Sequence, residues 1–436
     1  MWQTDPAANA GTLACPFCGL ACDDLRVESG ADGQPALSNG CERARSAFAA
    51  AFATPPGRPL IAGQPATLEQ AVARAAGLLA AARAPLFAGL ATDVNGMRAT
   101  LALADRCGAV LDHLGGDALF RNLLVLQDSG WMTATLTEVR NRADLIVLIG
   151  SQTLERFPRL LERVLLPPEA LFSPPKDRTL VLLGPWGAGS LPTELQAVRP
   201  TTIPCALDDL AGCLGLLRAL IAGRPARADG VPGVAGPALE SLAERLRGAR
   251  YAVLCWSAAE LELAHGELTV QTAVELVRDL NRRTRAAALP LAGTLGDVTA
   301  NQVCTWQTGY PLRSGRRHER LDYQPALYRY RDLLVRGECD LLLWIQALPC
   351  ADPPPATDRP TVVLGHPGIA LDSTPEVYVP VGLPGLDHPG HWYRSDSVCP
   401  LPLGQVRRLG LPSVAQVLGA LGDRLAVLDD GGAESC

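Results

Sequence analysis

Lysine is almost absent from this sequence of 436 residues, in which Lys176 is the only example. The other basic side chains are mostly arginines scattered along the chain, and the formal net charge at pH 7 is −6. Proteins that bind DNA or RNA gather basic residues on one face or along one helix. A nucleic-acid partner is therefore not expected.

Long hydrophobic runs are missing as well. The longest apolar stretch, Ala71–Ala91, contains Arg74, Arg83 and Pro85, so it predicts an amphipathic helix followed by a strand rather than a bilayer-spanning helix. Residues 1–6 carry neither the basic nor the apolar segment that begins a secretory signal. We expect a cytoplasmic protein that makes no membrane contact.

Cysteine, by contrast, is plentiful, and four of the 13 cysteines lie near the N-terminus. Cys15, Cys18 and Cys22 form a CxxCxxxC run, and Cys41 follows from a separate segment. This pattern is typical of a four-iron, four-sulfur cluster, which takes one thiolate per iron. Zinc usually takes cysteines in closely spaced pairs and ranks second; unliganded thiols rank third. Disulfides would need an oxidising compartment.

The nine remaining cysteines occur singly. Free cysteine often behaves as a small buried hydrophobe in a reducing compartment, and we expect that role for them. Examples are Cys107, Cys205, Cys213 and Cys255.

Apolar strands alternate with helices along most of the chain, which predicts an α/β fold with parallel sheets covered on both faces. The length predicts two or three domains. A helix over Leu68–Ala82 should begin at a capping box made by Thr67 and Gln70. The other expected helices are Asn95–Cys107, Leu123–Asn141 with a break near Gly130, Ala206–Ile221, Ala238–Arg247 and Gln271–Arg282. The expected strands are a hairpin at Leu25–Glu28 and Pro35–Leu37, and buried strands at Pro85–Gly89, Gly108–Leu111, Ala143–Gly150, Thr179–Gly184, Tyr251–Trp256, Asp340–Ile345, Thr361–Gly365 and Val377–Val381.

Three segments offer candidate ligand contacts. Two buried strands, Ala143–Gly150 and Thr361–Gly365, end in turns of small residues. Ligands of open α/β sheets bind beyond the carboxyl ends of strands, although many such turns bind nothing. The polar stretch Asn301–Pro311 predicts a loop that contacts a heterocyclic ligand or another protein, or that is held by its own hydrogen bonds. The candidate contact residues are Gly150, Ser151, Gly365, His366, Asn301, Gln302 and Trp306.

Two further clusters contain ionisable side chains. Asp387, His388 and His391 are close in sequence, but without a further clear ligand a structural or recognition loop is preferred over a metal site. A basic cluster predicts either a solvated loop or contact with an acidic partner or pyrophosphate. Its members are Arg313, Arg316, Arg317, His318 and Arg320.

Several motifs, in order and spacing, resemble the B subunit of formylmethanofuran dehydrogenase, within the molybdopterin oxidoreductase superfamily. They are Cys15–Cys22 with Asp23-Asp24, Leu126–Gly130, Glu138–Asp144, Asn301–Gly309 and Arg336–Ile345. The resemblance covers essentially the whole chain and is greatest to the form of this subunit found in bacterial formyltransferase/hydrolase complexes.

The resemblance implies a molybdopterin-oxidoreductase-like α/β fold without the superfamily's C-terminal β-barrel. It implies a cysteine module over residues 1–57, a first α/β domain over residues 58–157 and 335–436, and a second over residues 158–334. It also implies that the seven candidate contact residues are vestigial contacts to a pterin cofactor.

One position departs from the family. Its catalytic members ligate tungsten or molybdenum through a cysteine or selenocysteine nine residues before the glutamine of a Leu-Gln-Asp motif. Counting back from Gln127 gives Ala118, whose methyl group cannot ligate a metal. The family's next residues, His-Gly-Pro, are replaced by Leu119-Phe120-Arg121.

Two hypotheses follow. The first is a redox-inactive scaffold subunit of a formyltransferase/hydrolase complex in one-carbon metabolism linked to tetrahydromethanopterin and methanofuran. Its partners would be the other subunits, and it could hold a four-iron cluster but no molybdopterin. The alternative is an active tungsten or molybdenum bis-pterin formylmethanofuran dehydrogenase subunit. Ala118 favours the first hypothesis and leaves open whether the chain is itself an enzyme.

Overall fold

In the computed structural model the chain forms two compact units, which we call unit 1 (Met1–Gly116 with Gly293–Cys436) and unit 2 (Asp117–Ala292). The structure describes residues 12–29, 35–187, 191, 193–224, 231–317 and 320–433. No helix in these ranges combines the length and the apolar character that crossing a bilayer requires.

Unit 1 is built on a mixed sheet with nine described strands in the order β13-β12-β6-β5-β14-β15-β16-β3-β4. The middle strands β6, β5, β14, β15 and β16 run parallel, whereas the edges pair antiparallel. Every residue of β5 and β14 is buried, as expected for parallel strands covered on both faces. The bounds are β3 Leu60–Ile61, β4 Gln64–Pro65, β5 Pro85–Ala91, β6 Val110–Leu111, β12 Ser314–Arg317, β13 Arg320–Tyr323, β14 Leu341–Gln346, β15 Thr361–Gly365 and β16 Val377–Pro380.

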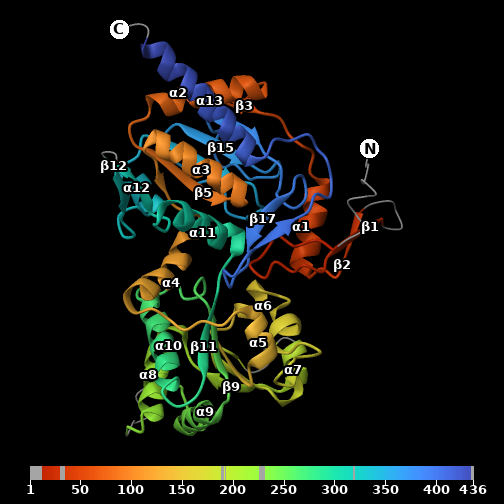
Figure 1. Ribbon diagram of the computed structural model, residues 1–436, viewed down its shortest axis with the longest axis vertical. Coiled ribbons are helices and arrows are strands. Elements are labelled where there is room, and N and C mark those ends of the chain that lie inside the picture. Colours follow the sequence, from red (N-terminus) through yellow and green to blue (C-terminus); the bar gives the residue numbers. More distant parts are fainter. Residues whose placement is uncertain are drawn as a thin grey trace. The chain divides into compact units, whose positions relative to one another are not determined.

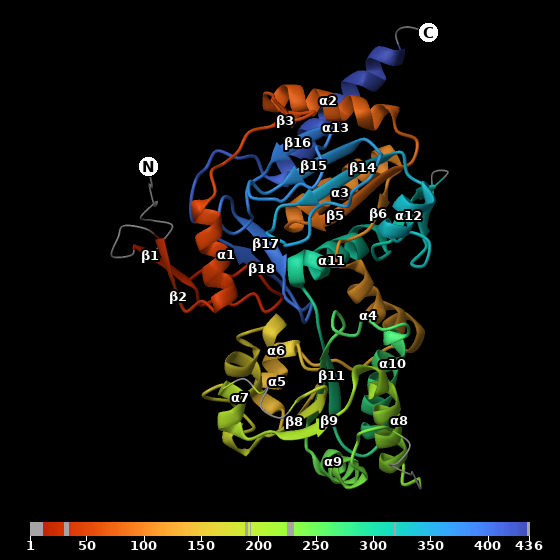
Figure 2. The same cartoon turned by 180° about the vertical axis from the view of Figure 1, so that it is seen from behind.

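Helices cover this sheet (Figure 1 and Figure 2). Helix α2 packs against β16, α3 packs against β5, and α13 contacts both helices. The predicted capping box is confirmed, because Thr67 and Gln70 each accept a hydrogen bond from the other's backbone N–H at the start of α2. The bounds are α2 Leu68–Ala81, α3 Val94–Cys107, η5 Thr294–Gly296, α11 Asp297–Thr308, α12 Tyr330–Arg336 and α13 Val414–Ala433.

The cysteine motif belongs to unit 1, where two short hairpins and one helix accompany the main sheet. The predicted strands after the cysteine loop are confirmed as the antiparallel pair β1 and β2. Residues 30–34, between the two strands, lie outside the described residues. The bounds are β1 Arg26–Ser29, β2 Pro35–Ser38, α1 Glu42–Ala53, β17 Gly390–Tyr393 and β18 Pro400–Leu403.

Unit 2 is built on a parallel sheet with five described strands in the order β11-β10-β7-β8-β9. In both views α8 and α10 lie on one side of this sheet and α5, α6 and α7 on the other (Figure 1 and Figure 2). The strands are β7 Leu145–Ile149, β8 Thr179–Gly184, β9 Thr201–Pro204, β10 Ala252–Ser257 and β11 Ala286–Leu291. The helices are α4 Gly116–Ser129, α5 Leu136–Arg142, α6 Thr153–Arg156, the π-helical turn η1 Leu161–Leu165, η2 Pro175–Asp177, α7 Thr193–Val198, η3 Leu207–Asp209, α8 Leu210–Ile221, α9 Gly236–Gly248 and α10 Gly266–Leu280.

The boundaries between the two units differ from the boundaries of the predicted domains. The first α/β domain was expected to extend to residue 157, yet β7 is the middle strand of the unit 2 sheet. The second domain was expected to end at residue 334, yet α11, β12, β13 and α12 belong to unit 1. The alternation of strands and helices continues across both boundaries. This pattern therefore does not show where the chain passes from one sheet to the other.

Candidate functional site

The four N-terminal cysteines lie on or next to a loop that doubles back on itself. Leu13 and Leu25 exchange two backbone hydrogen bonds, with N to O distances of 2.7 and 3.3 Å, which close the loop. Within it, the Cys15 N–H donates to the Cys22 carbonyl at 2.8 Å. Cys41 stands immediately before the first residue of α1. The backbone thus brings the motif's separate segments together.

The thiols are close enough to influence one another's charge. Cys15, Cys18 and Cys22 are buried, Cys41 is half-buried, and all four are free of disulfides. Burial raises the pKa of the Cys15 thiol well above its usual value, and the neighbouring Cys18, Cys22 and Cys41 raise it further. Burial also raises the pKa of Cys18. Thiols that stay protonated, as Cys15 and Cys18 do, would release protons on binding a metal.

Within the described residues, no three His, Cys, Asp or Glu side chains are grouped so that they could hold one metal ion. Zinc needs its ligands about 2.0–2.3 Å from one centre. An iron–sulfur cube binds one thiolate at each of its irons, so its four ligands are spread over a larger volume. The preference for iron–sulfur over zinc therefore rests on the spacing of the cysteines, and the cluster stays a prediction.

Ala118, at the family's metal-ligand position, lies in the first turn of α4 and is half-buried. The residues that replace the family's His-Gly-Pro are used for packing inside unit 2. Phe120 is buried, and Arg121 Nη1 donates to the carbonyl of Ala258 at 3.0 Å. The first turn of α4 therefore offers no thiolate at this position.

The segment before α4 is held by two buried ionisable side chains. The Asp112 carboxylate accepts a hydrogen bond from Arg313 Nε at 3.2 Å. His113 Nδ1 accepts the Gly115 N–H at 2.8 Å, and its Nε2 lies 3.0 Å from the Leu295 carbonyl, so the proton belongs on Nε2. Burial lowers the pKa of His113 to about 4, which keeps the ring neutral at pH 7.

Gly150 and Ser151 lie at the carboxyl end of β7, as predicted, but their donors already have a partner. The Ser151 N–H and hydroxyl donate to Glu260 Oε1 at 2.6 and 3.0 Å, and the Gln152 N–H donates to Oε2 at 2.9 Å. No pattern in the sequence indicates Glu260, which is 109 residues from Ser151 and belongs to no motif.

The candidates from the polar stretch lie on α11, so the predicted loop over residues 301–311 was wrong. Asn301 is buried, and its amide oxygen accepts the Leu312 backbone N–H at 3.2 Å. Gln302 is half-buried, whereas Trp306 is 61% exposed. The three side chains have different surroundings, and the described contacts do not join them into one site.

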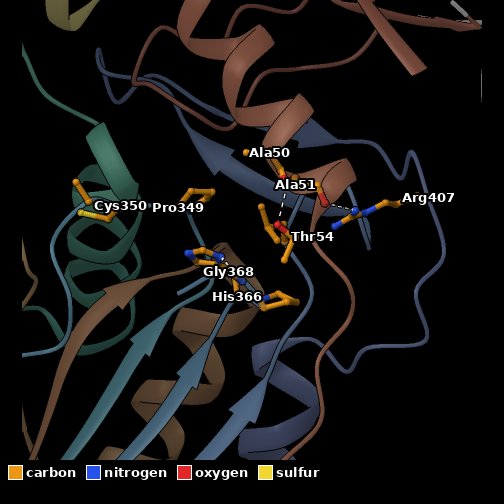
Figure 3. A pocket seen from close by; sticks show the side chains of 11 residues that line it. Ala50, Ala51, Thr54, Pro349, Cys350, His366, Gly368 and Arg407 are labelled. Carbon is orange, nitrogen blue, oxygen red and sulfur yellow. Dashed lines mark hydrogen bonds between the residues drawn. The ribbon is translucent and has the colours of Figure 1, made fainter. Parts of the chain in front are cut away.

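His366 lines a cavity of about 290 Å³ in unit 1 (Figure 3), and Gly365 precedes it as the last residue of β15. It lies beyond the carboxyl ends of β14, β15 and β16, where ligands of α/β sheets bind. The segments that follow these three strands line it, together with Ala50, Ala51 and Thr54 from the end of α1, and Arg407. The strand-end rule predicts the first group, but no local pattern in the sequence predicts α1 or Arg407.

His366 is the most unusual side chain of this cavity. It is 7% exposed, and its Nδ1 accepts the Gly368 N–H at 3.1 Å. Its buried Nε2 has no hydrogen-bond partner among the described residues. Burial lowers the pKa of His366 to about 4, so the ring is neutral and carries its proton on Nε2.

The predicted preference for a structural role over a metal site at residues 387–396 fits the contacts. Asp387 Oδ1 lies 2.5 Å from Arg407 Nε, and both side chains are buried. Asp396 pairs with Arg394 at 2.7 Å. His391 is exposed. The carboxylates of this segment therefore neutralise arginines.

The predicted basic cluster is divided in the structure. Arg313 is buried and paired with Asp112, whereas Arg316 pairs with Asp105 at the surface. His318 lies outside the described residues. The first arginine therefore supports the fold of unit 1 instead of facing an acidic partner.

The isolated cysteines largely occupy the predicted positions. Cys205, Cys213 and Cys255 are buried in unit 2, and Cys205 and Cys213 share one hydrophobic cluster with strands β7 to β10. Cys107, at the end of α3, is only half-buried.

Comparison with known proteins gives consistent matches. The chain is 32% identical to the B subunit of the formyltransferase/hydrolase complex Fhc of Methylorubrum extorquens over 331 residues, which are 74% of this chain and 85% of that protein. It is 28% identical to the B subunit of tungsten-containing formylmethanofuran dehydrogenase 2 of Methanocaldococcus jannaschii, over 90% of this chain and 93% of that protein.

A crystal structure of the formyltransferase/hydrolase complex FhcABCD from Methylorubrum extorquens, in complex with methylofuran, contains a similar chain. The TM-score is 0.74 at 28% identity, covering 85% of this chain and 99% of the other. No family model matches the sequence.

Proposed function

Because the chain belongs to the family formed by the B subunits of formyltransferase/hydrolase complexes and formylmethanofuran dehydrogenases, we propose that it is a scaffolding subunit of such a complex without a redox centre. Its partners in this proposal are the other subunits. They move a formyl group from tetrahydromethanopterin to a methanofuran-like carrier and hydrolyse it to formate, as the resemblance implies. The cytoplasm is the proposed compartment.

The observation that carries this proposal is Ala118 in the first turn of α4. Tungsten and molybdenum in this family need a thiolate or selenolate ligand, and a methyl group provides no electron pair. The turn at Gly150 argues in the same direction, because its donors are engaged by Glu260. The residues present do not fit a bis-pterin metal centre.

The fold supports the proposed ancestry. A small cysteine-containing segment accompanies two units with parallel sheets. We take this arrangement as molybdopterin-oxidoreductase-like, without the superfamily's C-terminal β-barrel. In such an arrangement the four N-terminal thiols would hold the iron–sulfur cluster, which would stabilise the module and transfer no electrons to a second centre.

The alternative is an active dehydrogenase subunit. It is favoured by the two relatives named as tungsten-containing, the second being the B subunit of formylmethanofuran dehydrogenase 2 of Methanococcus maripaludis, 25% identical over 94% of this chain. It would require a metal held without the family's ligand.

Metal and pterin analysis of the purified complex tests the proposal. We expect no stoichiometric tungsten, molybdenum or pterin, together with formyl transfer and hydrolysis by the assembled subunits. Ala118→Cys should leave these activities unchanged and should not create dehydrogenase activity, because a metal ligand also needs the residues that orient it. About one metal atom and two pterins per chain would establish the alternative instead.

A further inference from the structure

At the carboxyl edge of the unit 2 sheet, the donors of the Gly150–Gln152 turn bind the carboxylate of Glu260. Strands β7 and β10 are parallel neighbours, and Ile149 is in register with Trp256. The turns that follow both strands therefore meet at one edge. Glu260 reaches from the second turn into the first.

The contacts of Glu260 are those of a bound anion. Its two carboxylate oxygens accept three hydrogen bonds, from the Ser151 N–H, the Ser151 hydroxyl and the Gln152 N–H, at 2.6 to 3.0 Å. It is 6% exposed, and within the described residues no arginine, lysine or histidine pairs with it. Backbone N–H groups and a hydroxyl alone hold its charge, as such turns hold phosphate and other anions.

The turn leaves no space beside the carboxylate. Gly150 has a φ of +90°, and a β-carbon added to it would lie 2.3 Å from Glu260 Oε2. A β-carbon added to Gly184, at the end of the neighbouring β8, would lie 2.9 Å from the Gly150 α-carbon. A second anion could use the Ser151 and Gln152 donors only after Glu260 had left.

We propose that Glu260 is a built-in occupant of an anion site at the turn Gly150–Gln152, and that it excludes the phosphate groups of a nucleotide-type cofactor from unit 2. The carboxylate acts in two ways: it uses the donors that phosphate would need, and its negative charge repels phosphate. This inference rests on the proposed function, and it adds a named residue that keeps unit 2 free of cofactor.

The test uses the full chain in its complex and Glu260→Ala, which exposes the three donors. The probe is inorganic pyrophosphate. Its binding is measured by the shift in melting temperature and by titration calorimetry. We expect wild type to show no saturable binding. Glu260→Ala should bind pyrophosphate and gain roughly 5 °C in melting temperature at concentrations far above its Kd. Acetate should restore part of the stability that the variant loses, because it returns a carboxylate to the turn.

The matched control is Glu262→Ala, which removes an exposed carboxylate two residues away. It should behave as wild type, which separates the effect of the turn from a change in net charge. If Glu260→Ala does not fold, Glu260→Ser takes its place, because its hydroxyl can accept one of the three hydrogen bonds.

Three results would overturn the inference: pyrophosphate binding to wild type with slowed hydrogen exchange at Ser151 and Gln152, no binding to the folded Glu260 variant, or equal gains in both alanine variants. Failure of the proposed function has a different signature, namely metal and pterin in the wild-type complex. A pterin-free complex whose Glu260 variant gains nothing would contradict only the role of Glu260.

Discussion

At the scale of single residues, the segment that precedes α4 is held in place by a buried ion pair. The side chains of Asp112 and Arg313 are 0% and 7% exposed. The same carboxylate also accepts the backbone N–H groups of His113 and Tyr330. Breaking a buried pair by removing one partner leaves an uncompensated charge in the interior, which is strongly destabilising.

We therefore predict that Arg313→Met lowers the free energy of unfolding by about 3–5 kcal/mol in urea denaturation. The control is Arg316→Met, which removes the half-exposed pair with Asp105 and should cost no more than about 1 kcal/mol. Equal losses in the two variants would show that burial of the pair has no particular importance.

A second residue makes stability depend on pH. Asp297 is buried at the start of α11, and burial raises its pKa to about 7 although the N–H groups of Gly293 and Val298 donate to it. The folded pKa is above the unfolded value of about 4, so its contribution to stability is complete below pH 4 and is lost as pH rises through 7. Asp297→Asn, which stays neutral, removes this loss.

The prediction is that the stability of wild type falls relative to Asp297→Asn between pH 5 and pH 8, by on the order of 3 kcal/mol. Urea midpoints measured across that range check it. Asp423→Asn, at an exposed position, should follow wild type at every pH. Parallel curves for wild type and Asp297→Asn would mean that Asp297 titrates normally.

At the scale of elements, the sequence predicted what depends on local chemistry. The capping box at Thr67 and the largely buried strands β8 and β15 were placed correctly, because each is encoded within a few residues. Helix α4 ends at Ser129, beside the expected break at Gly130. Helix α11 was missed because its polar side chains are typical of a loop, whereas in the structure the Thr305 and Thr308 hydroxyls donate to backbone carbonyls one turn earlier in the helix.

The candidate site shows the same division. The strand-end rule placed Gly150, Ser151, Gly365 and His366 correctly at the edges of their sheets. Glu260 and Arg407 act across more than a hundred residues of sequence, at the Gly150 turn and at Ala51 respectively. Such partners follow from packing alone, and no spacing rule in one sequence predicts them.

The cysteine loop permits a prediction at this scale. If its four thiols hold a cluster, the energy of metal binding is part of the folding energy of the module. Anaerobically prepared protein should then contain iron with thiolate-to-iron absorption. Cys18→Ser should lose that absorption and should become more sensitive to proteolysis near the N-terminus.

Cys399→Ser, which alters an exposed cysteine, is the matched control and should keep both the iron and the resistance to proteolysis. An iron-free protein in which Cys18→Ser behaves like this control would mean that the thiols serve packing only.

At the scale of the whole molecule, large apolar side chains are exposed in both units. Leu171 and Phe172 are 78% and 60% exposed in unit 2, and Leu327 and Val335 are 55% and 87% exposed in unit 1. Soluble monomers rarely expose extensive apolar surface, and obligate interfaces bury roughly 2,000 Å² or more.

The chain produced without its partner subunits should therefore self-associate, as measured by light scattering on a sizing column. Leu327→Gln combined with Val335→Gln should reduce this association without lowering the melting temperature. A dispersed monomer at micromolar concentration would contradict dependence on partners.

The division of the chain into units also has a consequence for synthesis on the ribosome. Strand β5 (Pro85–Ala91) lies in the middle of the unit 1 sheet and pairs with β14 (Leu341–Gln346), which is translated roughly 250 residues later. At about 5–20 residues per second, this apolar strand waits for its neighbour for on the order of 10–50 s. Unit 2 is contiguous in sequence, so it can complete its own sheet during that interval. The nascent chain therefore carries a finished unit 2 and an unfinished unit 1, which makes the emerging polypeptide a substrate for chaperones that shield unpaired strands.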